Sequence, residues 1–229
     1  MGFLFNKKKI HTPEERRRIN NDKIKSLGIA CFENLPMIES STDVNLKDID
    51  TICKRAIASL LTIQVACDVA SGNDYEESKV FFTDFLNRFD VSECLLEKEK
   101  KMFSGEYTHQ DVLDISWTYE AYWSLVWALG LVNDMEIPDN ICDCHMAVRL
   151  VGDCKNYKSF KKQCKPRDIE EILDMLDLYY RYHWAVVDKS INPKTSIGNL
   201  NPNVVMERRR GLEWLISQEE DWNDISLDT

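Results

Sequence analysis

Glu120 is the most conspicuous charge in this sequence, because it lies in an almost wholly apolar stretch that holds three of the six tryptophans. Trp117, Trp123 and Trp127 lie three residues before it, three after it and seven after it, so a helix would group them around it. An ionised carboxylate there needs a buried cation, whereas a carboxyl that keeps its proton can serve as an acid or base. The side chains that could pair with it are Arg55, Arg181, His183 and Arg208.

His183 is the second residue that could do chemistry. It lies on an apolar stripe of the predicted helix 168–191, and on the neighbouring stripe Asp177 and Arg181 are four residues apart, which allows an ion pair. A histidine on an apolar face is most often a core residue with satisfied ring nitrogens, and the alternative is a base close to Glu120. If the helices stack as expected, the residues that could share one polar site are Glu120, Arg181, His183, Asp188, Glu207 and Arg208.

Cys142, Cys144 and His145 are weak candidates for a metal site. Structural zinc sites pair cysteines separated by roughly two to four residues, whereas a single residue separates these two. We favour small apolar cysteines at the start of a helix. The glycines are isolated from one another, so the sequence holds neither a dinucleotide fingerprint nor a P-loop, and no cofactor is expected.

The net charge of −10 weakens any hypothesis of nucleic-acid binding, because an acidic chain repels phosphate backbones. The run Arg208-Arg209-Arg210 does not change this, since three successive residues of a helix point in different directions. Charge is unevenly spread: residues 1–27 are basic, and residues 211–229 hold six acids and no Lys or Arg. We interpret these charge runs as a solvated N-terminal helix and an acidic tail. The net charge of −10 favours a protein partner, which would be basic if it is steered by electrostatics.

The chain of 229 residues is long enough for one large core, and its patterns predict an all-α fold. No long alternating run of β-branched residues indicates a strand. We expect about eight helices packed around a Trp-rich central helix at 109–129, in a single domain over 13–229 that follows a flexible basic N-terminus at 1–12. The predicted helices are 13–27, 46–71, 74–89, 92–104, 109–129, 143–151, 168–191 and 203–217.

The apolar stretch at 115–131 is too short for a membrane span, which takes about 20 residues, and it carries Glu120. The first residues lack the order of a secretory signal, and Asn6 stands where a myristoylation pattern has Ser or Thr. We therefore expect no membrane association and a cytoplasmic location. In that compartment the eight dispersed cysteines would be reduced.

Several strings of this sequence resemble a bacterial family called domain of unknown function 4272. They are WTYEAYWSLVWALG at 117–130, Cys142-Asp143, LYYRYHWAV at 178–186, Glu207-Arg208 and Leu212-x-Trp214-Leu215. The resemblance covers nearly the whole chain and implies a bacterial, intracellular, largely helical protein. It implies no activity, ligand or partner. The sequence departs from the family pattern at Arg209, where the pattern has histidine, and at Asn223, where it has aspartate.

Two functions from different classes remain open. The first is a non-catalytic binding or regulatory protein, acidic and rigid, which is favoured by the net charge and the lack of a catalytic motif. The alternative is a hydrolase or lyase whose acid/base site combines Glu120, His183 and Asp188.

Overall fold

The computed structural model describes residues 10–133, 135 and 137–229, and this part of the chain is helical, with no strand. The first half contains α1 (Pro13–Ser26), α2 (Ile49–Ala70), α3 (Tyr75–Phe89), η1 (Ser92–Cys94), α4 (Glu97–Ser104) and α5 (His109–Trp117). The second half contains α6 (Tyr119–Ala128), α7 (Cys144–Gly152), α8 (Tyr157–Lys161), α9 (Ile169–Ile191), α10 (Pro202–Ile216) and η2 (Trp222–Asp224). The predicted all-α class and single compact domain are confirmed.

Most predicted helix ends agree with the structure because local capping sets them. The Thr12 hydroxyl oxygen accepts a hydrogen bond from the Glu15 backbone N–H, and the Glu15 carboxylate accepts one from the Thr12 backbone N–H, so a capping box starts α1. The structure corrects the prediction of one helix over 92–104, because η1 and α4 are separate there. It adds the short helix α8, which has too few residues for an apolar period to be visible in the sequence.

The predicted single helix at 109–129 is wrong, since α5 ends at Trp117 and α6 begins at Tyr119. Thr118 has φ −64° and ψ −3°, and its hydroxyl donates to the Ile115 carbonyl 2.6 Å away. A hydroxyl that bonds to the preceding turn competes with regular helical hydrogen bonding. Trp117, the last residue of α5, is 38% exposed and lines a small pocket together with Glu120.

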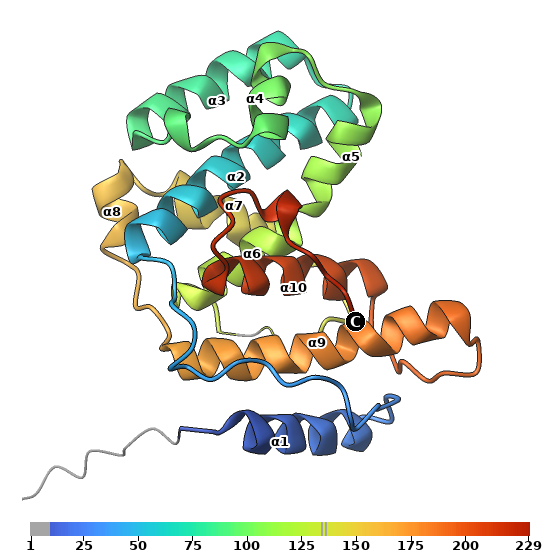
Figure 1. Ribbon diagram of the computed structural model, residues 1–229. Coiled ribbons are helices and arrows are strands. Elements are labelled where there is room, and N and C mark those ends of the chain that lie inside the picture. The colour runs from blue at the N-terminus through green and yellow to red at the C-terminus, as the bar shows by residue number, and fades with distance from the viewer. Residues whose placement is uncertain (1–9, 134, 136) are drawn as a thin grey trace, which may run out of the picture.

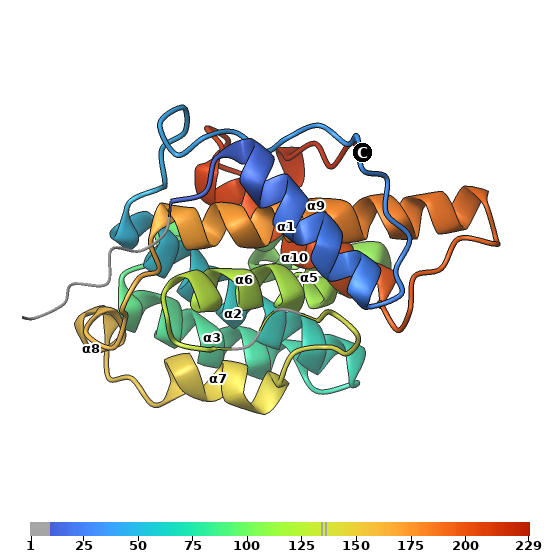
Figure 2. The same cartoon turned by 90° about the horizontal axis from the view of Figure 1, so that it is seen from below.

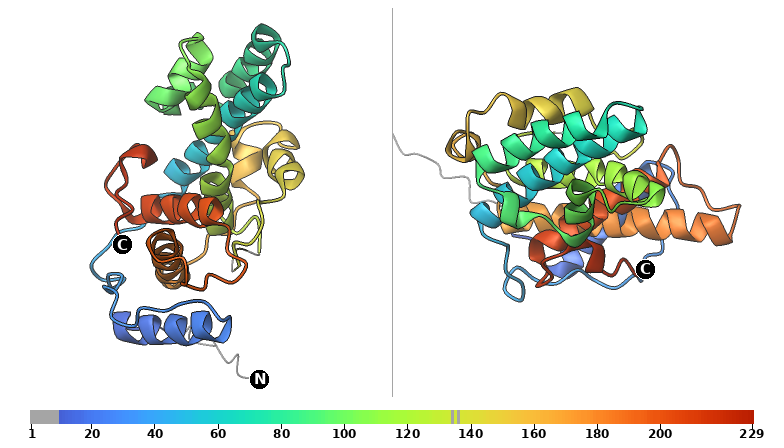
Figure 3. Two further views of the ribbon diagram at one scale, coloured as in Figure 1. Left: turned by 90° about the vertical axis from the view of Figure 1, so that its right-hand side faces the viewer. Right: turned by 90° about the horizontal axis from the view of Figure 1, so that it is seen from above.

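The helices form a stack of packed layers (Figure 1). All residues of α6 are buried, and this helix packs against α10 on one side and α2 on the other. α9 packs on α10, and α1 crosses the outer side of α9, as the view from below shows (Figure 2). α3 packs on α2, so that α1 and α3 lie at opposite ends of the stack (Figures 1 and 3).

Gly211 lets α10 approach α6 closely. A Cβ added at this position would lie 2.5 Å from the Ala121 carbonyl oxygen and 2.8 Å from Ser124 Cβ, which is closer than real Cβ atoms come to such neighbours. Ser124 also donates a hydrogen bond of 2.9 Å to the Arg208 carbonyl oxygen. The contact between α6 and α10 is thus a close backbone approach that holds Glu120 and Arg208 on facing helices.

Residues 1–9 of the predicted flexible N-terminus lie outside the described residues. Of the remainder, His11 contacts Asp174 on α9 at 3.0 Å, and Thr12 caps α1. None of the helices that the structure describes is both long enough and apolar enough to cross a membrane.

Candidate functional site

Glu120 is paired with Arg208, one of the four basic side chains that the sequence offers as partners. Arg208 Nε donates to Glu120 Oε2 at 2.8 Å, and the Cys142 backbone N–H donates to Oε1 at 2.7 Å. Glu120 is 1% exposed and Arg208 is 5% exposed. Both carboxylate oxygens are therefore satisfied within the core, as a buried charge requires.

Further contacts close the network around Arg208. Its guanidinium donates to Tyr179 Oη at 3.3 Å and to the Asn140 carbonyl at 3.4 Å, and Tyr179 donates to the Met135 carbonyl at 2.7 Å. A small pocket of about 180 Å³ borders Glu120, but its wall is mostly apolar, and both Glu120 oxygens already accept hydrogen bonds. The arrangement ties α6, α9 and α10 to Met135, Asn140 and Cys142, and it leaves Glu120 engaged with Arg208.

His183 accepts a hydrogen bond from Arg209. The two atoms, His183 Nδ1 and Arg209 Nη1, are 2.6 Å apart, and arginine can only donate, so Nδ1 carries no proton. Burial first, and then the charges of Arg209 and Arg210, lower the pKa of His183 to about 4. Arg209 is in turn neutralised by Glu213, which lies 3.1 Å away. His183 is thus a neutral core residue at physiological pH.

We expect His183→Gln to keep more of its free energy of unfolding than the wild type as pH falls. The unfolded imidazole takes a proton below its ordinary pKa of about 6.5 while the folded one stays neutral down to about 4, so protonation favours the unfolded state. The stability that His183 contributes is therefore lost as pH falls from about 6.5 to 4, by about 3 kcal/mol in full. Glutamine can accept from Arg209 without titrating. Urea unfolding of both proteins across this range measures the difference.

The free energy of unfolding has to be compared between wild type and His183→Gln at each pH. Burial raises the pKa of Glu207 and of Glu213, so these two groups make both proteins more stable as pH falls, and the comparison cancels their contribution. The exposed residue His109 provides the control, and His109→Gln should follow the wild-type curve. Parallel curves for wild type and His183→Gln would show that His183 titrates alike in the folded and unfolded states.

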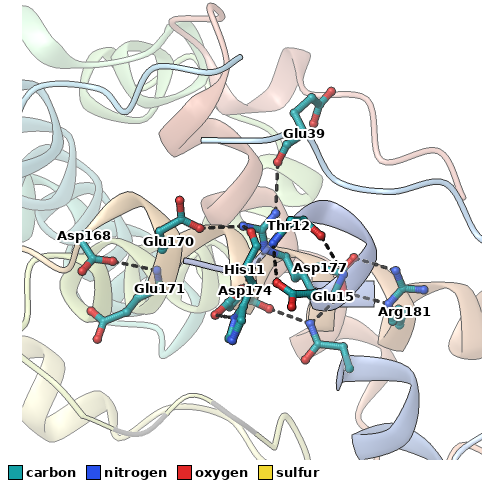
Figure 4. Close-up of polar contacts among 12 residues, drawn as sticks. His11, Thr12, Glu15, Glu39, Asp168, Glu170, Glu171, Asp174, Asp177 and Arg181 are labelled. Carbon is teal, nitrogen blue, oxygen red and sulfur yellow. Dashed lines mark hydrogen bonds and ion pairs between the residues drawn. The ribbon is translucent and has the colours of Figure 1, made fainter. Parts of the chain in front are cut away.

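Arg181 belongs to a second buried network, at the contact between α1 and α9 (Figure 4). The predicted ion pair with Asp177 is confirmed at 2.7 Å, and both side chains are fully buried. Asn20 of α1 donates to the same carboxylate at 2.8 Å, and Arg181 donates to Asn21 at 3.1 Å. One turn away, Arg16 bonds Asp174 and Glu170. Charged and amide groups therefore fasten α1 to α9.

Asp188 lies near the end of α9 and accepts a hydrogen bond from the Thr195 hydroxyl. Within residues 10–133, 135 and 137–229, no hydrogen bond or ion pair joins Asp188, Glu120 and His183 to one another. The structure thus engages each of the three with a different partner.

Glu207 is the member of the predicted set that borders a polar pocket on the surface. This pocket, of about 470 Å³, lies between α10 and the α4–α5 region. Burial raises the pKa of Glu207, and Arg210, whose Nε lies 3.2 Å from its carboxylate, opposes that rise. Lys98 and Asp114 form another ion pair in the wall at 2.8 Å. The complete lining is Lys98, Asp114, Trp117, Thr118, Asn203, Met206, Glu207, Arg210 and Asn223.

Cys142, Cys144 and His145 lie at the start of α7. Cys142 is buried, Cys144 is half-buried and His145 is exposed. A hydrogen bond from Cys142 is the main cause that lowers the pKa of Cys144 to about 7. In the part of the chain that the structure describes, no group of three or more His, Cys, Asp or Glu side chains is placed to hold a metal ion.

Helix α3 carries an exposed aromatic face that was not expected from the sequence. Val80 is 68% exposed and Phe81 is 55% exposed, and the ring of Phe81 lies 5.1 Å from that of Phe82 and 5.0 Å from that of Phe85. We use the name aromatic face for these four residues. Val80, Phe81 and Phe82 are consecutive in the sequence, and three consecutive residues of a helix cannot all point to one buried face. This run of apolar residues was the feature of the sequence that could have indicated the exposed face.

A pocket of about 380 Å³ adjoins the aromatic face at the junction of α2 and α3. We call it the acidic pocket, because the carboxylates Asp68, Asp74 and Glu77 line it and no basic residue does. Asp74 caps α3 by accepting from the Glu77 backbone, and Asp68 accepts from Asn73 and Ser78. The other lining residues are Asn73, Ser78, Phe81 and Phe82.

Comparison with known proteins identifies a family and nothing further. A family model described as Domain of unknown function (DUF4272) matches residues 16–225. No curated protein and no solved structure matches the chain.

Proposed function

The chain belongs to the DUF4272 family, and we propose that it is a non-catalytic binding protein for a basic protein partner. The observation that carries the proposal is the exposed aromatic face of α3 beside the acidic pocket. Apolar side chains that gather on a surface and are rimmed by polar groups are typical of interaction sites. Aromatic side chains in particular contribute much of the binding energy at protein interfaces.

The charges around the aromatic face favour a basic partner. Asp68, Asp74 and Glu77 face the pocket, and each ionised carboxylate has about four acceptor positions, so capacity remains after the hydrogen bonds already made. A lysine or arginine side chain would place its charge among these oxygens and its alkyl stem against Phe81 and Phe82. The net charge of −10 would also steer a basic partner toward the protein.

The buried contacts that already occupy Glu120 and His183 support a binding function over the alternative of a hydrolase or lyase. A catalytic acid or base must reach a substrate, whereas Glu120 and His183 each face a buried arginine. Among the predicted site residues, Glu207 borders the larger polar pocket, and a reaction in this protein would most readily be located there.

Binding of a short amphipathic peptide of leucine and lysine tests the proposal. We expect the wild-type protein to bind it, and Phe81→Ser and Glu77→Gln each to weaken binding about tenfold, or about 1.4 kcal/mol. The first change removes the exposed ring and the second removes a pocket charge without touching the backbone cap of α3. Isothermal titration at low and physiological salt measures both affinity and its electrostatic part.

Matched controls lie elsewhere on the surface. Ile191→Ser changes an exposed apolar residue at the end of α9, and Asp43→Asn changes an exposed carboxylate between α1 and α2. Both variants should bind like the wild type. Equal affinity for a peptide of leucine and glutamate, or equal affinity of all four variants, would count against a basic partner on this surface.

A further inference from the structure

Two cysteines that are distant in the sequence face each other between α2 and the segment after α8. Cys53 Sγ lies 3.7 Å from Cys164 Sγ. We propose that this pair is a site of oxidative modification, at which a peroxide converts the two thiols into a disulfide. Because a disulfide bond measures about 2.0 Å, each sulfur needs to move by less than about 1 Å.

The two thiols differ in burial and in pKa, and stepwise oxidation requires one accessible thiol that ionises more readily than the other. Cys53 is fully buried, and the hydrogen bond to Cys164 together with burial raises its pKa. Cys164 is half-buried, and the hydrogen bond from Cys53, helped by the charge of Lys161, lowers its pKa. The thiolate is the reactive form of cysteine, and a peroxide can reach Cys164 but not the fully buried Cys53. Cys164 is therefore the attacking sulfur and Cys53 is the resolving one.

The backbone on both sides of this contact is held in place. Cys53 lies within the long helix α2, and the residues after Cys164 are fastened to the end of α6. The Lys165 N–H donates to the Leu129 carbonyl and the Arg167 N–H donates to the Ala128 carbonyl, each at 2.8 Å. The backbone next to Cys164 is thus tied to α6, and the fold keeps the two sulfurs 3.7 Å apart.

The reaction balances with hydrogen peroxide as the oxidant. The Cys164 thiolate attacks one peroxide oxygen, the O–O bond breaks, and a sulfenic acid forms on Cys164 as hydroxide leaves. Cys53 then attacks Cys164 Sγ, the S–S bond forms, and the sulfenic oxygen leaves with a proton as water. Two thiols lose two electrons in total, and one peroxide becomes two waters.

The disulfide would close a long loop, because the two cysteines are 111 positions apart. A loop of this length removes much conformational entropy from the unfolded chain. We therefore expect the oxidised protein to melt on the order of 10 °C higher than the reduced protein.

Peroxide treatment of the folded, full-length protein tests the proposal. Peptide mapping without reductant should recover one cross-linked peptide that joins Cys53 to Cys164, and dithiothreitol should reverse both the cross-link and the rise in melting temperature. In Cys53→Ser, Cys164 should accumulate a sulfenic acid that dimedone labels. In Cys164→Ser, neither product should form at this pair.

Cys144 is the internal competitor, because its pKa is lowered to about 7 and it lies beside Cys142. Peptide mapping distinguishes the two pairs directly, and Cys144→Ser should leave the Cys53–Cys164 cross-link unchanged. The proposal is overturned if peroxide modifies Cys144 while Cys53 and Cys164 remain thiols, or if Cys164 oxidises without forming a bond to Cys53.

Discussion

Replacing Glu120 with alanine is expected to lower the free energy of unfolding by about 3–5 kcal/mol. The change leaves the guanidinium of Arg208 buried without its carboxylate and removes the acceptor of the Cys142 backbone N–H. A buried unpaired charge costs more than the pair contributes, and a domain of this kind has only about 5–15 kcal/mol of stability in total. Urea unfolding followed by circular dichroism measures the loss.

A double-mutant cycle separates the orphaned charge from the cavity that the substitution leaves. Arg208→Met combined with Glu120→Ala should be less destabilising than the sum of the two single changes, because the double variant buries no lone charge. Glu120→Gln keeps an acceptor for Cys142 and should lie between wild type and alanine. A loss below about 1 kcal/mol for Glu120→Ala would contradict a buried ion pair.

Replacing Gly211 with alanine is expected to destabilise the protein by about 1–3 kcal/mol. In an unconstrained helix the same change adds stability, because alanine has the higher helix propensity. At Gly211 the added methyl group would meet the Ala121 carbonyl oxygen at 2.5 Å, so α10 would have to move away from α6. The sign of the effect, read from thermal or urea unfolding, therefore reports the packing between these helices.

Gly152 is the matched control for Gly211. It lies at the end of α7, and a Cβ placed there would meet no atom within 4 Å. Gly152→Ala should leave stability unchanged or raise it by up to about 1 kcal/mol. If Gly211→Ala behaved in the same way, the close approach of α6 and α10 would not exist in solution.

The helices could be predicted from the sequence where local interactions decide them. The predicted helix at 168–191 agrees with α9 within one residue, because an apolar period and the Asp168 cap both lie in the sequence. The break at Thr118 was missed, because the apolar pattern continues through it while the hydroxyl bonds backward. A periodic pattern does not show where a side chain competes with the helix for a hydrogen bond.

The candidate site was only partly predictable for a different reason. The sequence limited the possible partners of Glu120 to four basic side chains. The four-residue spacing of Asp177 and Arg181 predicted their ion pair on one helix. Nothing local favours Arg208 over the other three. The packing of α10 on α6 selects it, and that packing depends on Gly211.

By itself the sequence determined the helical class, most helix ends and the need of Glu120 for a partner, because periodicity, caps and burial of charge act over a few residues. The tertiary structure alone decided which residues meet: Arg208 with Glu120, Arg209 with His183, and Cys53 with Cys164. It also decided that the aromatic face of α3 remains uncovered. Contacts between distant segments depend on how whole helices pack, and a single sequence does not encode that packing in any local pattern.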